Sequence, residues 1–314
     1  MMADTLRRHI GPIAALALAI AFPFAARALG QEFYVGFASR VLILALFASS
    51  LNLIVGLGGM VSLGHAALFG AGAYVVGIAS AEIGPGTSAL LTWPLAMGAG
   101  ALLALFIGAI SLRTHGVYFI MITLAFAQMV YYVFVSLKAW GGDDGLSLPR
   151  RSSLPGVSLA DDVTFYLVVL ALCAAVVHAL ARLSRSRFGV VLVGIRDNEA
   201  RMASLGYATF RYRLVAFVIS GALAGLAGAL MANQNNFVSP NMMHWEQSGV
   251  ALVMVILGGL ASPWGGLAGA GAFLILEEAL QALTRHWQIP LGVILLLVVF
   301  FAPRGIAGGF ERRR

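Results

Sequence analysis

Long apolar stretches follow one another along the chain, separated by short polar segments. Several windows of 18 or more residues hold few charged side chains, which is the length that a helix needs to cross a bilayer. They lack the ~10-residue alternation of a membrane β-barrel, so we expect the spanning elements to be helices. Ten stretches are candidate spans: residues 10–29, 36–57, 59–81, 89–112, 116–137, 163–183, 212–232, 247–260, 265–283 and 288–303.

Composition agrees with this pattern and predicts an all-α polytopic membrane protein. Hydrophobic residues make up 60% of the 314 residues and charged residues only 11%, whereas a soluble protein carries roughly a quarter charged residues. The net charge of +7 would suggest nucleic acid in a soluble protein. Here the basic residues gather between the apolar stretches, where they orient a membrane protein, so we expect a lipid bilayer and no nucleic acid as partner.

The placement of arginine sets the expected orientation. With a cytoplasmic N-terminus, the inner segments hold fourteen of the 20 lysines and arginines and the outer segments hold four. The excess of positive charge on one side predicts that both termini are cytoplasmic. An N-terminal signal cleaved near Ala26-Arg27-Ala28 is an alternative, although the apolar run is slightly long for a signal peptide.

The absence of certain motifs narrows the function. The one cysteine, Cys173, lies in an apolar stretch, and CxxC, HExxH and closely spaced histidines are all missing. The only lysine is Lys138, so no phosphate-binding GxxxxGK[ST] loop exists in the sequence. We therefore expect no catalytic residue, metal or cofactor, and any ATP must bind another chain. The stretches are nearly free of acids away from their ends, which disfavours an alternative function as a secondary transporter or channel for a small polar solute.

The stretch from Leu51 to Val75 combines an apolar sequence with glycines and polar side chains. It either turns tightly at the membrane surface or breaks within the membrane, where free backbone groups would line a path. We assume that a helix follows Gly59, which would place Ser62, His65 and Phe69 on one face. Helix–helix hydrogen bonding is the plainer explanation for these polar groups. The candidate pathway residues are Asn52, Gly58, Gly59, Ser62, His65 and Phe69.

Two polar segments divide what we expect to be a single membrane domain over residues 1–314. The inner segment, 184–211, contains a predicted short helix that Asp197 caps and Gly206 ends. Met202 and Leu205 share a face of that helix, which could enter a groove of a partner or lie on the membrane. The outer segment, 138–162, contains Asp143-Asp144-Gly145, a plain turn that could also guard an outer entrance.

These features occur together in one known family. The segment SLNLIVGLGGMVSLGHAALFGAGAY (Ser50 to Tyr74), the GGDDGLS loop and the later glutamate–alanine loop occur in the same order as in M-type permease subunits of branched-chain amino acid ABC importers, which the chain resembles along nearly its whole length. The resemblance implies an inner-membrane permease of bacteria with the ribose/vitamin-B12-type importer fold and about ten transmembrane helices. It also implies a second, related permease in a heterodimer, two cytoplasmic ATPase subunits and a periplasmic binding protein.

The same resemblance assigns the inner segment to ATPase coupling. Importer permeases carry there the pattern Glu-Ala-Ala, three residues, then Gly. Glu199 and Ala200 match this pattern, Arg201 replaces the second alanine, and Gly206 falls one residue late. The Ile-x-Leu-Pro that follows in the family is missing. The resemblance implies coupling residues as follows: Asp197, Glu199, Ala200, Met202, Leu205 and Gly206.

Overall fold

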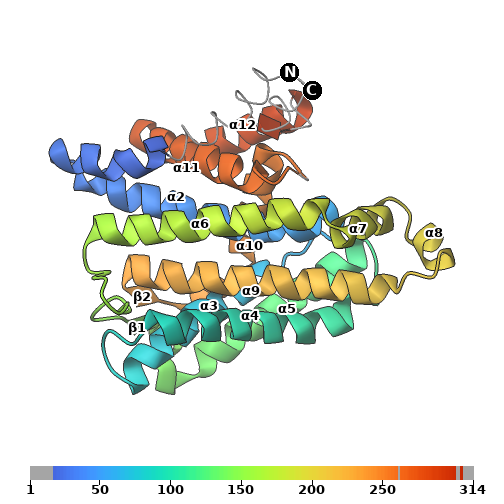
Figure 1. The fold of residues 1–314 in the computed structure, drawn as a ribbon, viewed down its shortest axis with the longest axis horizontal. Coiled ribbons are helices and arrows are strands. Elements are labelled where there is room, and N and C mark those ends of the chain that lie inside the picture. The colour runs from blue at the N-terminus through green and yellow to red at the C-terminus, as the bar shows by residue number, and fades with distance from the viewer. Residues whose placement is uncertain (1–16, 261, 302–304, 307–314) are drawn as a thin grey trace.

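The computed structural model describes residues 17–260, 262–301 and 305–306, and it is mainly helical. The long helices α2, α6, α9 and α4 run side by side along the longest axis of the molecule (Figure 1). Within the described residues, six helical segments are long and apolar enough to cross a membrane. They are α2 (Glu32–Asn52) with the π-helical turn η1 (Leu53–Leu57), α4 (Ala89–Ser111), α5 (Val117–Ser136), α6 (Asp162–Arg185), α9 (Thr209–Asn235) and α11 (Gly265–Leu283).

The other predicted spans correspond to shorter helices. These are residues Ala17–Ala28, α3 (His65–Glu82), α10 (Trp245–Gly258) and α12 (Gln288–Phe301). The start predicted for the third span is wrong, because α3 begins at His65 and the backbone from Gly58 to Gly64 is not helical. The residues 10–16 and 302–303 of the first and last predicted spans, and the terminal segments used for orientation, lie outside the described residues.

Both polar segments contain more structure than the sequence predicted. The inner segment forms α7 (Arg187–Asp197) and α8 (Glu199–Ser204), at the end of the bundle that we call the α8 end. At the opposite end, the β1 end, lie the 3₁₀ turns η2 (Lys138–Trp140) and η3 (Gly142–Asp144) and the strand β1 (Leu146–Ser147). This strand pairs antiparallel with β2 (Phe237–Val238), which follows α9 and precedes the 3₁₀ turn η4 (Pro240–Met243). The part of the chain that the structure describes is thus helical with one short β ribbon.

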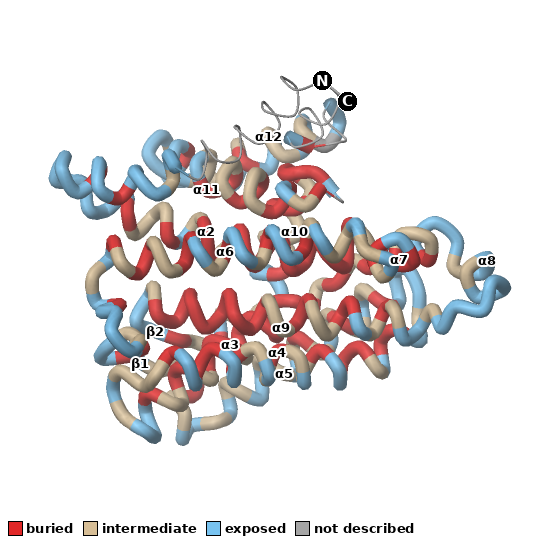
Figure 2. Tube along the Cα trace, in the orientation of Figure 1, coloured by how far each residue is buried: buried red, intermediate tan, exposed pale blue. Residues whose placement is uncertain are grey.

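Helix α9 lies in the core of the bundle, and most of its length is buried in Figure 2. Its glycines allow neighbouring backbones to approach closely. A Cβ at Gly228 would collide with the carbonyl oxygen of Phe69 in α3, and one at Gly225 would collide with that of Ala96 in α4. The glycines of α9 therefore serve helix packing, as expected for helices in lipid.

Arg151 fixes the outer segment to the ends of two helices. Its guanidinium donates to the carbonyl oxygens of Asn233 (3.1 Å) and Leu159 (3.2 Å) and pairs with Asp162 at 2.6 Å. It also lies 4.7 Å from the ring centre of Phe165. One arginine thereby joins the end of α9 to the start of α6.

Asp161 caps α6, and its contribution should depend on pH. Its carboxylate accepts hydrogen bonds from the backbone N–H of Thr164 (3.0 Å) and from its hydroxyl (2.9 Å). These bonds, with Arg27 and Arg151 nearby, lower the pKa of Asp161 below its usual value. A depressed native pKa stabilises the fold above the usual carboxyl pKa, and this stability is lost as the pH falls through the native pKa. We expect Asp161→Ala to cost about 1 kcal/mol at pH 7.

Thermal unfolding of the purified protein at neutral and acidic pH would measure this effect. The difference between wild type and Asp161→Ala should shrink below the usual carboxyl pKa, and Asp144→Ala, at an exposed position, should have little effect at either pH. Equal stabilities at neutral pH would contradict the capping role.

Candidate functional site

The glycine cluster lies where α2 ends, beside the inner segment. Arg196 of α7 donates from Nη1 to the carbonyl oxygen of Gly56 at 2.6 Å. Gly59 has φ +65°, and a Cβ there would lie 2.6 Å from Cγ of Arg196. Gly58-Gly59 therefore turns at the α8 end of the bundle, and the non-helical backbone then leads inward to His65.

A second break follows α9 and approaches from the other end. As α3 advances from Ala66 through Gly70 to Gly77, it meets Ser248, then Met243, then Val238. The segment from Val238 through Ser248 into α10 therefore runs antiparallel to α3, and the first turns of α3 and α10 lie side by side. Ser248 Oγ accepts a hydrogen bond from the backbone N–H of Ala66 at 2.8 Å. Each half of the chain thus contributes a long helix, a break and a short helix that begins inside the bundle.

His65 lies at the start of α3 among hydroxyl groups. Its Nε2 lies 2.9 Å from Ser50 Oγ and 3.4 Å from Ser220 Oγ. Ser50 donates its proton to the carbonyl oxygen of Phe47, and Ser220 donates to that of Ser50. Because both hydroxyl protons are used, Nε2 of His65 is the donor in its two contacts and Nδ1 is the bare nitrogen. His65 is fully buried, and its Nδ1 has no hydrogen-bond partner among the described residues.

The predicted row of Ser62, His65 and Phe69 on one helical face is wrong in part. Ser62 precedes α3, and its hydroxyl accepts from the N–H of Gly64 at 3.2 Å. His65 and Phe69 do share a neighbour, because the ring of Phe47 lies 5.6 Å from His65 and 4.5 Å from Phe69. All three predicted residues are buried, so they are packed together with the core in this conformation.

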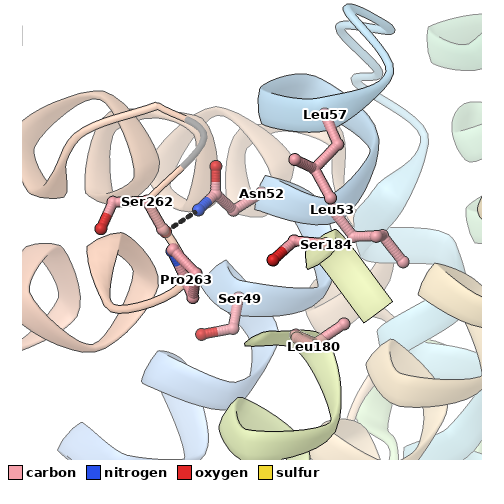
Figure 3. A pocket seen from close by; sticks show the side chains of 8 residues that line it. All are labelled: Ser49, Asn52, Leu53, Leu57, Leu180, Ser184, Ser262 and Pro263. Carbon is pink, nitrogen blue, oxygen red and sulfur yellow. Dashed lines mark hydrogen bonds between the residues drawn. The ribbon is translucent and has the colours of Figure 1, made fainter. Parts of the chain in front are cut away.

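Asn52 holds the loop before α11 and borders a small cavity. Its Nδ2 donates to the carbonyl oxygen of Ser262 at 2.8 Å (Figure 3). The cavity measures about 20 Å³, which suits one water molecule and is far below the size of an amino-acid site. The eight residues that line it are Ser49, Asn52, Leu53, Leu57, Leu180, Ser184, Ser262 and Pro263.

The predicted coupling helix exists, although its cap differs. Asn198 caps α8, accepting from the N–H of Arg201 at 2.9 Å, while Asp197 ends α7 and binds the guanidinium of Arg196. Asp197 was predicted as the cap from its residue type, but the helix begins one residue later. Glu199 lies in the first turn and contacts Arg213 of α9 at 3.1 Å and His115 at 3.0 Å. Glu199 thereby ties α8 to the membrane helices.

Of the remaining coupling candidates, Met202 contacts α7, whereas Leu205 is exposed. Met202 packs against Gly194 of α7, with Sδ 2.9 Å from where a Cβ would lie. Leu205 is 67% exposed just after α8, so Met202 and Leu205 do not form one buried face. Gly206 has φ +86°, which confirms the left-handed end of the helix. Ala200 is exposed in α8.

The outer candidates Asp143 and Asp144 lie in η3 at the β1 end, and both are exposed. They belong to a 3₁₀ turn framed by Gly141 (φ +84°) and Gly145 (φ +79°), so the predicted plain turn is tighter than expected. Nearby, Trp140 donates to Glu82 at 3.4 Å, which joins η2 to the end of α3.

One polar group was missed by sequence reasoning. His244 and Glu246 flank the first residue of α10, with 3.8 Å between His244 Nδ1 and Glu246 Oε2. The ring of Tyr131 in α5 lies 5.3 Å from that of His244. His244 and Glu246 stand next to a long apolar stretch in the sequence. Only the inward start of α10 shows that they lie within the length of the bundle.

Comparisons with known proteins agree on one family. The family model described as branched-chain amino acid transport system / permease component matches residues 33–302. The high-affinity branched-chain amino acid transport system permease protein LivM of Salmonella typhimurium is 28% identical over 96% of this chain and 76% of its own length, and LivM of Escherichia coli K12 gives the same values. The autoinducer 2 import system permease protein LsrC of Klebsiella pneumoniae is 38% identical over 29% of this chain and 26% of its own length. No solved structure matches the chain.

Proposed function

Because the chain belongs to the family of branched-chain amino acid transport permease components, we propose that it carries branched-chain or related amino acids or amides across the bacterial inner membrane. It is the permease subunit of an ATP-binding-cassette importer, and ATP is hydrolysed on separate subunits. The match over residues 33–302 carries this proposal. It replaces the secondary transporter or channel that the sequence had left open, since the relatives are permeases of import systems.

The two ends of the bundle differ in a way that suggests their partners. At the α8 end, the exposed Leu205 and the helix α8 would offer a surface for two ATPase subunits, and the arginines of the inner segment favour a cytoplasmic position for this end. The termini would then be cytoplasmic as well. At the β1 end, the exposed Asp143 and Asp144 would meet a periplasmic binding protein or guard the outer entrance.

The helices also support a proposal for the architecture of the membrane domain. The six long helices, with the four shorter helices between and beside them, would make about ten spans of the ribose/vitamin-B12-type fold in a single membrane domain over residues 1–314. In the most apolar part of α5 only 17% of the residues are buried, compared with 83% in that of α2. A second, related permease in a heterodimer would face this open helix across the passage.

The two antiparallel short helices suit an amino-acid carboxylate. Helix N-termini present free N–H groups and positive partial charge, and α3 and α10 place two of them near each other inside the bundle. Of the predicted pathway residues, Asn52, Gly58, Ser62, His65 and Phe69 are buried in this conformation and Gly59 is exposed. We assign to them the closed part of the pathway, which would open when the breaks move.

Reconstitution tests the function. The chain would be purified with its second permease and ATPase subunits, placed in proteoliposomes, and supplied with the binding protein and radiolabelled leucine. Uptake should require internal ATP and the binding protein together, and an ATPase variant unable to hydrolyse ATP should show no uptake. Uptake that persists without ATP, or follows a sodium or proton gradient, would contradict the proposal.

A further inference from the structure

The exposed face of α5 carries polar side chains among its apolar ones. The exposed side chains of α4 are apolar, for example Leu95, Leu102 and Phe106. On α5, the polar Tyr132 and Ser136 are exposed beside the apolar Met129 and Val133, and with Gln128 they line a wide-open hollow of about 420 Å³ on this one helix. The amide Nε2 of Gln128 is buried there without a hydrogen-bond partner among the described residues. Polar side chains around a hollow on a membrane helix indicate contact with water or protein.

Aromatic rings connect this hollow to the start of α10. Tyr132 lies 5.1 Å from Tyr131, Tyr131 lies 5.3 Å from His244, and His244 lies 6.1 Å from Trp245, measured between ring centres. The next residue is Glu246, whose side chain is 70% exposed, while that of His244 is 31% exposed. The ring contacts therefore link the hollow on α5 to the His244–Glu246 pair, and we call this group of residues the α5–α10 face.

This carboxylate lies within the length of the bundle, away from its ends. Met243, just before α10, packs on Gly70 of α3, and Ser248, one turn into α10, bonds the first turn of α3. Glu246 lies between these two contacts in the sequence, so it shares their depth. An exposed carboxylate at that depth is costly in lipid, which makes a water-filled or protein-covered surface the expected setting.

We propose that the α5–α10 face lines the passage of the amino acid, and that Glu246, together with His244, holds its ammonium group. The inference rests on the proposed function and adds a site to it. The N-termini of α3 and α10 favour the carboxylate of a zwitterion but repel its ammonium. Glu246 supplies the opposite charge, and the faces of Tyr131 and Trp245 add the electron-rich surface that attracts cations. The site thus takes α-amino acids and disfavours carboxylic acids without an amine.

The first test compares uptake with ATP hydrolysis in the reconstituted transporter. Glu246→Gln keeps the size of the side chain and removes its charge. We expect the maximal rate of leucine uptake to fall about tenfold or more, while ATP hydrolysis stimulated by the binding protein stays at the wild-type level. Glu278→Gln, at an exposed carboxylate on α11, is the matched control and should transport normally. Normal uptake by Glu246→Gln would overturn the proposal.

The second test does not depend on transport. It measures the electrostatic potential near the site through the reactivity of an introduced thiol. Tyr132→Cys in a Cys173→Ala background should react with water-soluble thiol reagents, and about tenfold faster with a cationic than with an anionic one. That preference should disappear when Glu246→Gln is added. Leu102→Cys, on the apolar face of α4, should react with neither. A Tyr132→Cys thiol that stays unreactive, or a preference that survives Glu246→Gln, would contradict the inference.

The two proposals can fail separately. If the wild type shows no uptake that depends on ATP and the binding protein, the proposed function fails. If the wild type transports leucine and the variants behave as the controls do, the function stands and the assignment of Glu246 fails.

Discussion

Arg196→Ala should reduce ATP-driven uptake by about ten- to a hundredfold while the ATPase subunits remain bound. Arg196 is the direct link between α7 and the break before α3, through its bond to the carbonyl oxygen of Gly56 and its packing on Gly59. A hydrogen bond from a charged group is worth roughly 1.5–3 kcal/mol, which is the size of this change in rate if the bond transmits movement of α7. Without this hydrogen bond, a movement of α7 would no longer be transmitted to the break before α3.

A second arginine on the same helix provides the control. Arg187 is exposed at the start of α7, so Arg187→Ala removes the same charge from the same helix without touching the break. Uptake in proteoliposomes and co-purification of the ATPase would be measured for both variants. If Arg196→Ala and Arg187→Ala transported alike, or if Arg196→Ala simply lost the ATPase, the link would have no role in coupling.

Gly225→Val should prevent folding. Gly225 lies where α9 crosses α4, and a Cβ there would collide with the carbonyl oxygen of Ala96. The carbonyl of Gly225 itself closely approaches Gly72 of α3, so moving α9 away from α4 would press it into α3. Overpacking of side chains costs about 1–3 kcal/mol, and a collision with backbone on both sides exceeds that range. Such a loss is comparable with the whole stability of many proteins.

Gly98 offers a matched comparison within α4. No atom lies within 4 Å of a Cβ built at Gly98, so Gly98→Val carries the same change in helix propensity without a collision. Size-exclusion profiles in detergent and thermal unfolding would distinguish the two. A monodisperse Gly225→Val protein that melts near the wild-type temperature would show that the helices can separate at little cost.

Hydrophobic pattern alone predicted most of the helices, because a bilayer demands long apolar segments. It failed where tertiary contacts replace helical hydrogen bonds. The break before α3 was predicted to end at Gly59, yet it continues to His65, where Ser248 of α10 receives the N–H of Ala66. A partner far away in the sequence leaves no local signal, so the later start of α3 could not be found from the pattern.

The candidate site shows the same limit. The turn at Gly58-Gly59 and the short helix α8 could be predicted because glycine and capping residues act locally, although the cap itself lies one residue later than predicted. The contacts of Glu199 with Arg213 and His115 could not be predicted, because these three residues come from three separate segments of the chain. Glu246 was missed for a related reason. Its position in the sequence follows a polar loop, and only the inward course of that loop places it at depth.

The meeting of α3 and α10 has an electrical consequence for the cell. Two helix N-termini at one depth each carry about half a positive charge, in a medium that screens it poorly. Glu246 at the same depth carries one negative charge, so a bare sodium ion or proton finds little net attraction there, whereas a zwitterion pairs with both the helix ends and the carboxylate. The membrane potential drives cations inward with ~2.3 kcal/mol per charge per 100 mV, so an importer that opens in every cycle needs such insulation. The paired helix ends would thus let nutrient pass while preserving the ion gradients of the cell.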